Sequence, residues 1–501
     1  MGGKLKFQIR RLTAALSVVI LSATACVSSP SSSASASCAL SVGSLYEPQN
    51  LDNAGGGGQG AAEALGGNVY EALFRLTEAG AVEKSLVSDY TVSPDGLTYT
   101  FVLRRGVRFH SGTPMTSDDV RHSLRRILAG TSTSSRKNVL DMIKSVDAPD
   151  DHTVVVRLSS RSISLIYNLS QVWIVNHTLA DPKTAEDGTG PYRLASWKRG
   201  ATLTMERFGG YWGAAPKCGQ VTFRYYTEAA ALNNALLSGA VDVVTSVQSP
   251  DALAPFSDTS AFRITEGTST TKLLLAFNCR RAPFDKPLVR RAVSAAIDDA
   301  KLLRSIWGER GTVIGSMVPP SDPWYEDLSG ENAYDVEAAK RMLAEAGYPD
   351  GFAMTLDTPQ YDPHPTIAEF VKSELAKVGI TVTIDVISAD EWYSRVFQRH
   401  DFAATLQEHV NDRDIRYYGD PGFYWGYDNP EVSDLIRRSE SAKTTREQTE
   451  LLRRANHEIV EDAASDWLYL NPQIVVASAH VTGYTANAVQ AQFPVYGIDK
   501  R

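Results

Sequence analysis

The chain has 501 residues, of which 43% are hydrophobic and 22% are charged, and its formal net charge is −8. This length exceeds that of one ordinary hydrophobic core and predicts two or three domains, while the composition is that of an ordinary globular protein. The acidic balance, without a basic stripe or zinc-finger spacing, argues against DNA or RNA as a partner.

The N-terminal 25 residues have the pattern of a secretory signal. A positively charged segment precedes the apolar run "LTAALSVVILSATA", which is too short to span a bilayer comfortably. The following "ATAC" resembles a bacterial lipobox that ends at Cys26, with Ala23 where such motifs usually have Leu. We expect Cys26 to be lipidated, and the alternative is an ordinary secretory signal with an incidental Cys. Residues 26–37 are rich in Ser and are predicted to form a flexible tether.

Three further cysteines follow, at Cys38, Cys218 and Cys279. An exported chain can form disulfides. We predict a Cys38–Cys218 disulfide, because each of these residues precedes a probable strand, and Cys218–Cys279 is the alternative. The chain has no C-x-x-C pair and no clustered His pairs, so we expect neither a zinc site nor any other metal or cofactor.

The stretch "TPMTSDDVRHSLRRIL" could be mistaken for a catalytic cluster, because it combines acidic residues, a His and several Arg. Thr116 and Asp119 have the spacing of a capping box, and the first-turn acids suit the helix dipole. Val120, Leu124 and Leu128 form one apolar stripe. The pattern therefore predicts the start of a helix, and not an active site.

The rest of the chain alternates strands and helices. "VTFRYYTEAAALNNALLSGAVDVV" predicts a strand–helix–strand unit, and "ITVTIDVI" alternates as a half-buried strand does. Asp335 is placed to cap a helix that stops at Gly347, and a long helical stretch is expected near Glu431 to Asp462. This order predicts an α/β protein with parallel strands.

Four segments carry a resemblance to a known family, and their order and spacing agree from about Cys38 to about Ser478. The segments are Leu86–Leu128, Gly188–Gly213, Leu273–Asp298 and Tyr334–Gly351 with the strand that follows it. With these segments the chain resembles the extracytoplasmic solute-binding proteins of bacterial ABC importers, in the oligopeptide/dipeptide-binding family (family 5). The family usually has Asp where this chain has Ser111, within a turn.

The resemblance implies an α/β, two-lobe periplasmic-binding-protein-like fold of type II, with a hinge and an extra α+β subdomain in lobe I. The hinge crossings are expected near Phe277–Asn278 and near Asn471–Val476. The implied ranges are 38–270 for lobe I, with the subdomain at about 66–185, 271–475 for lobe II, and 476–501 for a return to lobe I.

The resemblance also implies a function without catalysis. A monomer would capture a peptide or another small solute by hinge closure and deliver it to an ABC permease. Its place would be the outer face of the cytoplasmic membrane, held by the lipid on Cys26. The ligand itself cannot be read from the sequence, since similar frameworks accept peptides, sugars, opines and metal chelates.

Candidate ligand-binding residues follow from the same resemblance. The family pairs the ligand amine with an acidic residue in a lobe II loop, which here gives Asp412 and Asp414 as candidates. The alternative is that these are solvated loop acids. Rings near this loop supply apolar area with a polar tip and can hold a cation. The remaining candidates, some of which could be plain core residues, are Tyr46, Glu47, Trp392, Tyr417, Tyr424 and Trp425.

The main alternative function is that of an exported hydrolase acting on peptides or similar small substrates. The sequence has no H-E-x-x-H, G-x-S-x-G or Walker A motif, so none of these catalytic arrangements supports it.

Overall fold

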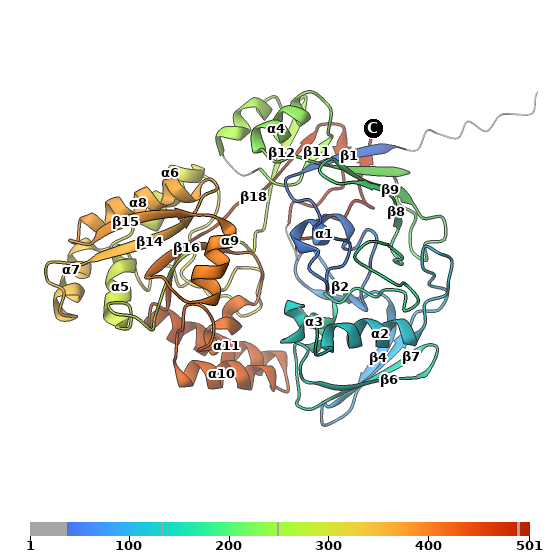
Figure 1. The fold of residues 1–501 in the computed structure, drawn as a ribbon, viewed down its shortest axis with the longest axis horizontal. Coiled ribbons are helices and arrows are strands. Elements are labelled where there is room, and N and C mark those ends of the chain that lie inside the picture. Colours follow the sequence, from blue (N-terminus) through green and yellow to red (C-terminus); the bar gives the residue numbers. More distant parts are fainter. Residues whose placement is uncertain (1–37, 133, 248–249, 488–490) are drawn as a thin grey trace, which may run out of the picture. The chain divides into compact units, whose positions relative to one another are not determined.

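The computed structural model describes residues 38–132, 134–247, 250–487 and 491–501. The predicted signal (1–25), the lipidation site Cys26 and the tether (26–37) lie outside these residues. Figure 1 shows the described chain as a ribbon, with two large sheets flanked by helices. Among the described residues, no helix combines the length and the apolar character that crossing a bilayer requires.

The first large sheet has seven strands and is mixed. Its β1 is parallel to both β10 and β11, and the other neighbours are antiparallel. Leu40 and Val42 alternate along β1 and are buried, as expected for a strand that packs one face on a core. The order is β12 (Phe262–Gly267), β18 (Gln473–Ser478), β11 (Val243–Val244), β1 (Ala39–Ser44), β10 (Gln220–Tyr225), β9 (Thr202–Arg207) and β8 (Tyr192–Lys198).

Helix α4 (Ala229–Leu237) connects β10 to β11, so the predicted strand–helix–strand unit is present. Helix α1 (Gly58–Leu65) follows β1 and buries Ala61, Ala64 and Leu65 in the same core. Small residues allow this close packing: a Cβ on Gly60 would lie 2.4 Å from the backbone of Glu47.

The second large sheet has five strands, ordered β15 (Thr381–Ile387), β14 (Ala353–Pro359), β16 (Ala404–His409), β13 (Lys272–Phe277) and β17 (Ser465–Leu470). Every residue of β13 and β17 is buried, which agrees with the apolar runs "LLLAF" and "WLYL" within them. Figure 1 shows helices around this sheet. They are α5 (Pro287–Ala295), α6 (Asp299–Trp307), α7 (Val336–Glu345) and α8 (His364–Ala376).

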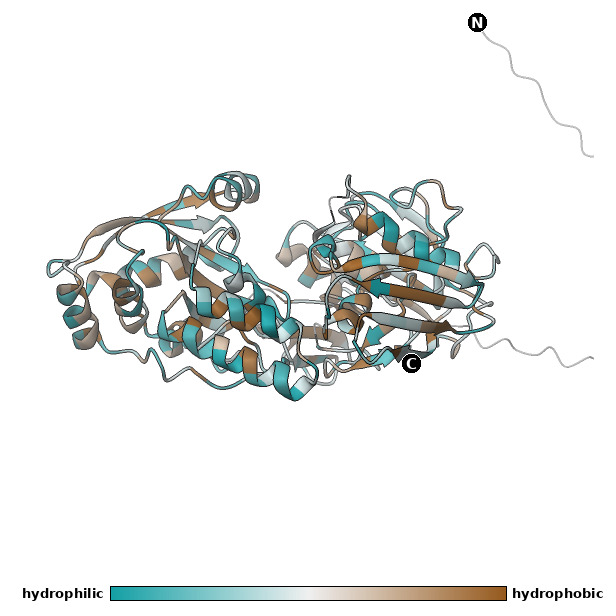
Figure 2. Cartoon of the chain, turned by 90° about the horizontal axis from the view of Figure 1, so that it is seen from below, coloured by the Kyte–Doolittle hydropathy of each residue, from teal (hydrophilic) through white to brown (hydrophobic). Residues whose placement is uncertain are grey.

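The stretch predicted as one long helix near Glu431 to Asp462 is two helices, α10 (Pro430–Glu440) and α11 (Thr445–Glu461). The Thr444 side chain accepts a hydrogen bond from Glu447 N–H and so starts α11. Upstream, Ser388 caps α9 (Ala389–Glu391), which continues as a π-helical segment, Trp392–Gln398. Figure 2 shows teal and brown residues alternating along helices, as expected where one helix face packs inward and the other meets water.

A third, four-stranded sheet has the order β4 (Val87–Val92), β5 (Thr98–Leu103), β7 (Thr153–Leu158) and β6 (Ile143–Asp150). Helix α2 (Ser117–Leu128) packs on it through Val120, Leu124 and Ile127. The smaller elements are α3 (Leu165–Leu169), β2 (Phe74–Leu76), β3 (Val82–Lys84), β19 (Val481–Thr482), β20 (Asp499–Lys500) and the 3-10 helices Ser135–Lys137, Pro250–Phe256 and Asp414–Gly419.

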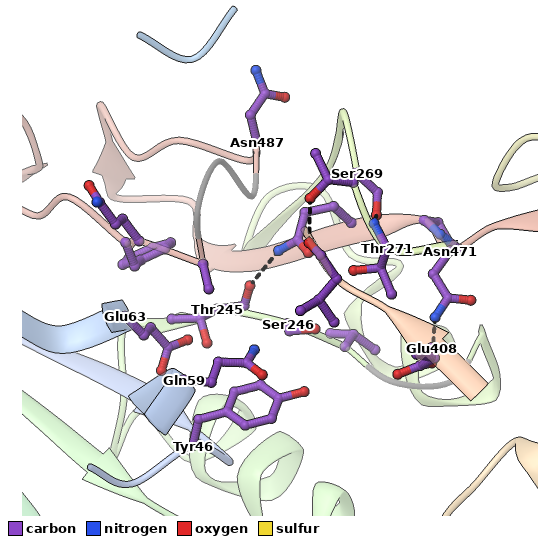
Figure 3. Close-up of a pocket in the computed structure, with 18 of the residues that line it drawn as sticks. Tyr46, Gln59, Glu63, Thr245, Ser246, Ser269, Thr271, Glu408, Asn471 and Asn487 are labelled. Carbon is purple, nitrogen blue, oxygen red and sulfur yellow. Dashed lines mark hydrogen bonds between the residues drawn. The ribbon is translucent and has the colours of Figure 1, made fainter. Parts of the chain in front are cut away.

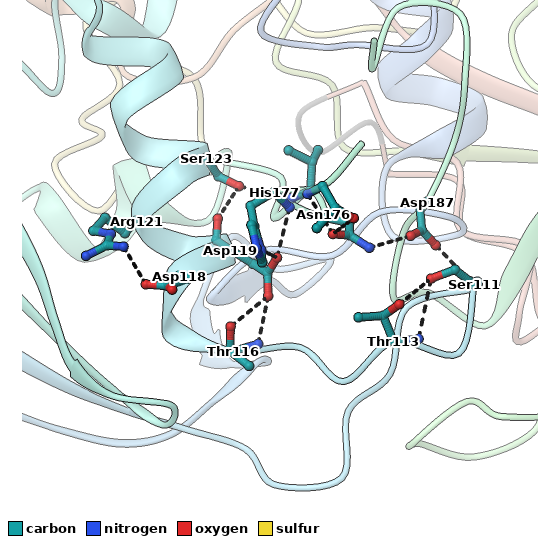
Figure 4. A network of polar contacts seen from close by, with 12 residues as sticks. Ser111, Thr113, Thr116, Asp118, Asp119, Arg121, Ser123, Asn176, His177 and Asp187 are labelled. Atoms are coloured by element: carbon teal, nitrogen blue, oxygen red, sulfur yellow. Dashed lines mark hydrogen bonds and ion pairs between the residues drawn. The ribbon is translucent and has the colours of Figure 1, made fainter. Parts of the chain in front are cut away.

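The acidic start of α2 is structural, as its sequence predicts. The backbone N–H of Thr116 donates to Asp119 Oδ2 over 2.8 Å and completes a capping box. The other carboxylate oxygen of Asp119 accepts from the backbone and the ring of His177, and the Asp119 carbonyl accepts from Ser123 (Figure 4). Nearby, Ser111 donates its backbone N–H to Asp187. Thr116 and Asp119 therefore hold the start of the helix, and Ser111 holds the turn before it.

The chain crosses between the two large sheets twice. It leaves the seven-stranded sheet after Gly267 and enters the five-stranded sheet at Lys272, and it returns between Leu470 and Gln473. The expected first crossing, near Phe277–Asn278, is therefore wrong: Phe277 pairs with Ala404 at the far end of β13. β13 is a fully buried strand of the five-stranded sheet. The connection between the two large sheets is the short polar segment 268–271, which precedes β13.

A disulfide joins Cys38 to Cys218, which is the predicted pairing, and Cys279 is free. The bond links the start of β1 to the residues just before β10. Because β1 and β10 are parallel neighbours, it fixes their register from one end. It closes a sequence separation of 180 residues.

Candidate functional site

A pocket of about 110 Å³ lies where the two crossing segments run side by side. The segments are joined by the Asn471 N–H, which donates to the Thr271 carbonyl over 2.9 Å. The lining comes from both large sheets and from the C-terminal segment. The residues used below are Tyr46, Gln59, Glu63, Thr245, Trp307, Glu408, Asn471 and Gln473.

Glu63 approaches the pocket from α1 and is only 6% exposed. The Ser44 hydroxyl, at the end of β1, donates to its Oε2. Burial raises the pKa of the Glu63 carboxyl to about 7, while hydrogen bonds from Ser44 and Thr245 act to lower it. A carboxyl with this pKa changes its charge near neutral pH, which is typical of functional sites.

Glu408 approaches from the end of β16, and its side chain accepts a hydrogen bond from Asn471 Nδ2 over 2.6 Å. Burial raises the pKa of Glu408, and the Asn471 bond acts against that rise. Figure 3 shows Glu63, Gln59 and Tyr46 on one side and Glu408 with Asn471 on the other. The two carboxyls therefore come from α1 and from β16 and line one pocket.

Of the predicted residues, Tyr46 lines this pocket. Its neighbour Glu47 does not: Glu47 accepts hydrogen bonds from Trp197 Nε1 at 3.0 Å and from Gly200 N–H at 2.9 Å. Its predicted contact with a ligand stays a prediction. The carboxylate of Glu47 holds the β8–β9 turn against the loop that follows β1.

Asp414 is also placed away from the pocket. It is completely buried, and its Oδ2 lies 3.4 Å from Nζ of the equally buried Lys272. Although burial acts to raise it, the pKa of Asp414 is lowered by the Lys272 ammonium and the His409 ring. The structure thus gives this acid a partner inside the core, and its contact with a ligand stays a prediction.

Asp412 has a different partner. Both of its carboxylate oxygens accept from the Tyr167 hydroxyl, which lies on α3, and Arg413 stacks on the same tyrosine ring with its guanidinium carbon 3.5 Å from the centroid. Burial and the charge of Asp412 raise the pKa of Tyr167. In this arrangement Asp412 joins two parts of the chain, and its pairing with a ligand amine stays a prediction.

The predicted aromatic residues divide into core and partly exposed positions. Tyr424 and Trp425 are 1% and 0% exposed and belong to a hydrophobic core, and their contact with a ligand stays a prediction. Trp392 is half-buried and donates its Nε1–H to Thr405. Tyr417 is half-buried and stacks on Phe423 with the ring centroids 4.5 Å apart. Neither residue is among the described residues that line the pocket.

A second and larger cavity, of about 470 Å³, lies near α3, α10 and α11. Its described lining includes the guanidinium groups of Arg161, Arg413, Arg416 and Arg437. Glu440, at the end of α10, accepts hydrogen bonds from Ser162 and Ser164 beside this cavity. The two cavities thus differ in charge: the smaller one presents carboxyl groups, and the larger one is rich in arginine.

Sequence reasoning missed Glu63 and Glu408, and only Glu63 leaves a signal. Glu63 is the single charged residue in the small-residue run "GQGAAEALGG", whereas Glu408 stands between the polar residues Gln407 and His409. A charge in an otherwise apolar segment is informative, because burial without a role is costly. The sequence does not reveal that the two groups line one pocket, since they are far apart along the chain.

Comparisons with known proteins agree on one family. The family described as "Bacterial extracellular solute-binding proteins, family 5 Middle" matches residues 81–438. A curated relative, the glutathione-binding protein GsiB of Salmonella choleraesuis (strain SC-B67), is 29% identical over 341 residues. That match covers 66% of this chain and 66% of the relative, so the chain spans slightly less than two thirds of the relative's length.

Solved structures show the same fold. The binding protein AgaA from A. tumefaciens R10, in complex with agropinic acid, is 26% identical with a TM-score of 0.79, covering 93% of this chain and 99% of that one. The oligopeptide-binding protein AppA from Bacillus subtilis, in complex with a nonapeptide, is 21% identical with a TM-score of 0.80, with coverage of 93% and 99%. The predicted two-lobe, type II α/β fold is thereby confirmed.

These relatives bind solutes and are not enzymes, so the hydrolase alternative is not retained. The family match covers more than half of the chain and includes the segments that carried the resemblance. The chain belongs to the bacterial extracellular solute-binding proteins of family 5.

Proposed function

We propose that the chain captures a peptide or a related small solute outside the cytoplasmic membrane and delivers it unchanged to the permease of an ABC importer. The observation that carries this proposal is the pocket at the two crossings, whose walls come from both large sheets and from both connections. A solute that touches both lobes binds best when they are close together, and it shifts the population toward that state.

Only a difference in affinity between the two states can drive this shift. The crossings suit such a movement, because each connection between β12 and β13, and between β17 and β18, is a short segment outside regular strands. Few backbone angles then need to change when the sheets move. We also propose lobe boundaries near residues 270 and 475. The chain passes from one large sheet to the other at residues 268–271 and returns at residues 471–472.

The names of the relatives support a small polar solute. GsiB is a glutathione-binding protein, AgaA is seen with agropinic acid and AppA with a nonapeptide. All three ligands carry several hydrogen-bonding groups, and the pocket of this chain is lined mainly by polar residues. We therefore place the ligand among peptides and related amino-acid derivatives.

The membrane attachment is proposed from the sequence alone. A lipid on Cys26, followed by the tether, would hold a monomer at the outer face of the cytoplasmic membrane, near its permease. Changing Cys26 to Ala should release the mature chain from the membrane fraction, and retention of this variant by membranes would remove the proposal.

Native mass spectrometry of the purified chain tests the function. After incubation with an extract of small molecules from the native growth medium, we expect a complex with one solute per chain. Denaturation should release that solute with unchanged mass. No bound solute from any extract, or a released product that differs from the captured compound, would contradict the proposal.

A further inference from the structure

The pocket at the crossings has an unusual balance of charge. Its described lining contains two carboxyl side chains, Glu63 and Glu408, and includes no Lys, Arg or His. The buried ammonium of Lys272, at the start of β13, forms an ion pair with Asp414 and donates a hydrogen bond to the Asn411 carbonyl. A ligand carboxylate placed here would meet two acids without a compensating cation, which is costly in a partly desolvated site.

The pocket also offers acceptors that need donors. Glu408 receives one hydrogen bond from Asn471 Nδ2, while the amide oxygen Oδ1 of the same asparagine is buried with no hydrogen-bond partner among the described residues. A buried acceptor without a donor costs free energy, so a ligand that brings N–H groups gains from this arrangement. An ammonium group carries three donors and a guanidinium group five.

The raised pKa values of the two pocket carboxyls agree with a preference for a cationic ligand. Burial raises the pKa of both Glu63 and Glu408, because no cation near them compensates for lost hydration. A bound cation would favour the ionised forms and form charge-assisted hydrogen bonds with them. A cationic ligand would thus supply the charge and the hydrogen-bond donors that these two buried carboxyl groups lack.

Aromatic rings stand beside the acids. Tyr46 lines the pocket, and Tyr361, which follows β14, is 46% exposed. Burial raises the pKa of Tyr361, and the negative charge of Glu408 adds to the rise. Rings next to carboxylates are a common environment for organic cations.

The size of the pocket limits what enters it. Its volume of about 110 Å³ is well below the roughly 300–1,000 Å³ of a pocket that encloses a drug-sized molecule. In this arrangement it accommodates a head group, and the rest of a larger ligand would extend beyond it.

We propose that this pocket binds the cationic head of the ligand, an ammonium or guanidinium group carried on a polar framework, between Glu63 and Glu408, and that it rejects a carboxylate. This inference rests on the proposed function and names the class of group that the site selects. It assigns the recognition of charge to these two acids, and not to Asp412 or Asp414.

Two matched series of compounds test the charge preference by thermal unfolding of the purified chain at millimolar ligand. The first is glucosamine, glucose and gluconate, which share hydroxyl groups and carry positive, zero and negative charge. The second is dialanine amide, N-acetyl-dialanine amide and N-acetyl-dialanine, with the same order of charge. We expect the cationic member of at least one series to raise the unfolding midpoint, and its neutral and anionic partners not to do so.

The sources of the cation are separated by the same experiment. A response to glucosamine alone indicates an amino sugar or a similar polyhydroxylated amine, and a response to dialanine amide alone indicates the amino end of a peptide. Either response supports the inference. An anionic or neutral member that stabilises the chain as well as the cation, or no response to either cation, overturns it.

Variants connect the response to the two acids. Glu408→Gln and Glu63→Gln keep the shape of the side chain and remove its charge, and we expect each to weaken binding of the responding cation at least about tenfold. Glu337→Gln is the matched control, since Glu337 is exposed on α7, away from the pocket lining, and pairs with Lys340. Circular dichroism establishes that each variant folds. Unchanged affinity in both pocket variants overturns the inference.

Failure of this inference is distinguishable from failure of the proposed function. If the chain captures an anionic solute from an extract, it still binds solutes, and only the assignment of charge is wrong. If it captures none, the proposed function fails first.

Discussion

Lys272 and Asp414 form an ion pair that is completely buried, with Nζ and Oδ2 3.4 Å apart. Lys272 opens β13 at the first crossing, and Asp414 begins the 3-10 helix in the loop after β16. The pair therefore ties a crossing segment to the loop in which ligand-binding acids were predicted. Its low exposure makes it a structural element of that loop.

Removing one partner of this pair should destabilise the protein strongly, because the other charge stays buried and uncompensated. We expect Lys272→Met and Asp414→Asn each to lower the free energy of unfolding by about 3–5 kcal/mol, and the double variant to recover part of that loss. Urea denaturation measures these differences. Lys340→Met, which breaks an exposed pair with Glu337, should cost less than about 1 kcal/mol. A loss below about 1 kcal/mol for Lys272→Met would contradict this account.

Glu63 makes stability depend on pH. Its pKa is raised from 4.5 to about 7 in the folded chain, so the folded state holds its proton more tightly than the unfolded state does. The stability that this provides is fully present below pH 4.5 and is lost as the pH rises through about 7. Glu63→Gln cannot ionise, so its free energy of unfolding relative to wild type should increase across this window.

The increase should approach about 3 kcal/mol, since each pKa unit corresponds to roughly 1.4 kcal/mol, and should level off above the window. Denaturation at a series of pH values measures it, with Glu337→Gln as the exposed control. A difference between Glu63→Gln and wild type that stays constant with pH would show that the carboxyl does not titrate in this range.

The Cys38–Cys218 disulfide should contribute to stability by restricting the unfolded chain. Reduction, or replacement of both residues by Ser, should lower the free energy of unfolding by about 2–5 kcal/mol. Cys279 is free, so Cys279→Ser should retain the full response to reductant. Unfolding midpoints that are the same with and without reductant in the wild-type chain would rule out this contribution.

The loop acid Asp412 offers a direct comparison with the pocket acids. Because its carboxylate already accepts from Tyr167, we expect Asp412→Asn to change ligand affinity less than tenfold, measured by isothermal titration. The resemblance to peptide binders predicts the opposite, a loss of about 2–5 kcal/mol for truncating a charge pair with the ligand amine. A large loss for Asp412→Asn, together with no loss for Glu408→Gln, would favour that earlier assignment.

Local features of this fold could be predicted from the sequence, because they depend on neighbours along the chain. The capping box of Thr116 and Asp119, the Asp335 cap and the strand–helix–strand unit around α4 are of this kind. The site was harder to predict. Asp414 looks like a solvated loop acid until Lys272, 142 residues earlier, is placed beside it. In the same way, nothing in the sequence pairs Glu63 with Glu408, and only the fold brings them to one pocket.

Movement of the two lobes around a bound solute is the central claim, and small-angle X-ray scattering of the purified chain measures it most directly. Curves recorded with and without the solute identified by native mass spectrometry should differ, with a smaller radius of gyration for the loaded chain. Superimposable curves at saturating solute, in a sample whose loading is verified, would contradict the account.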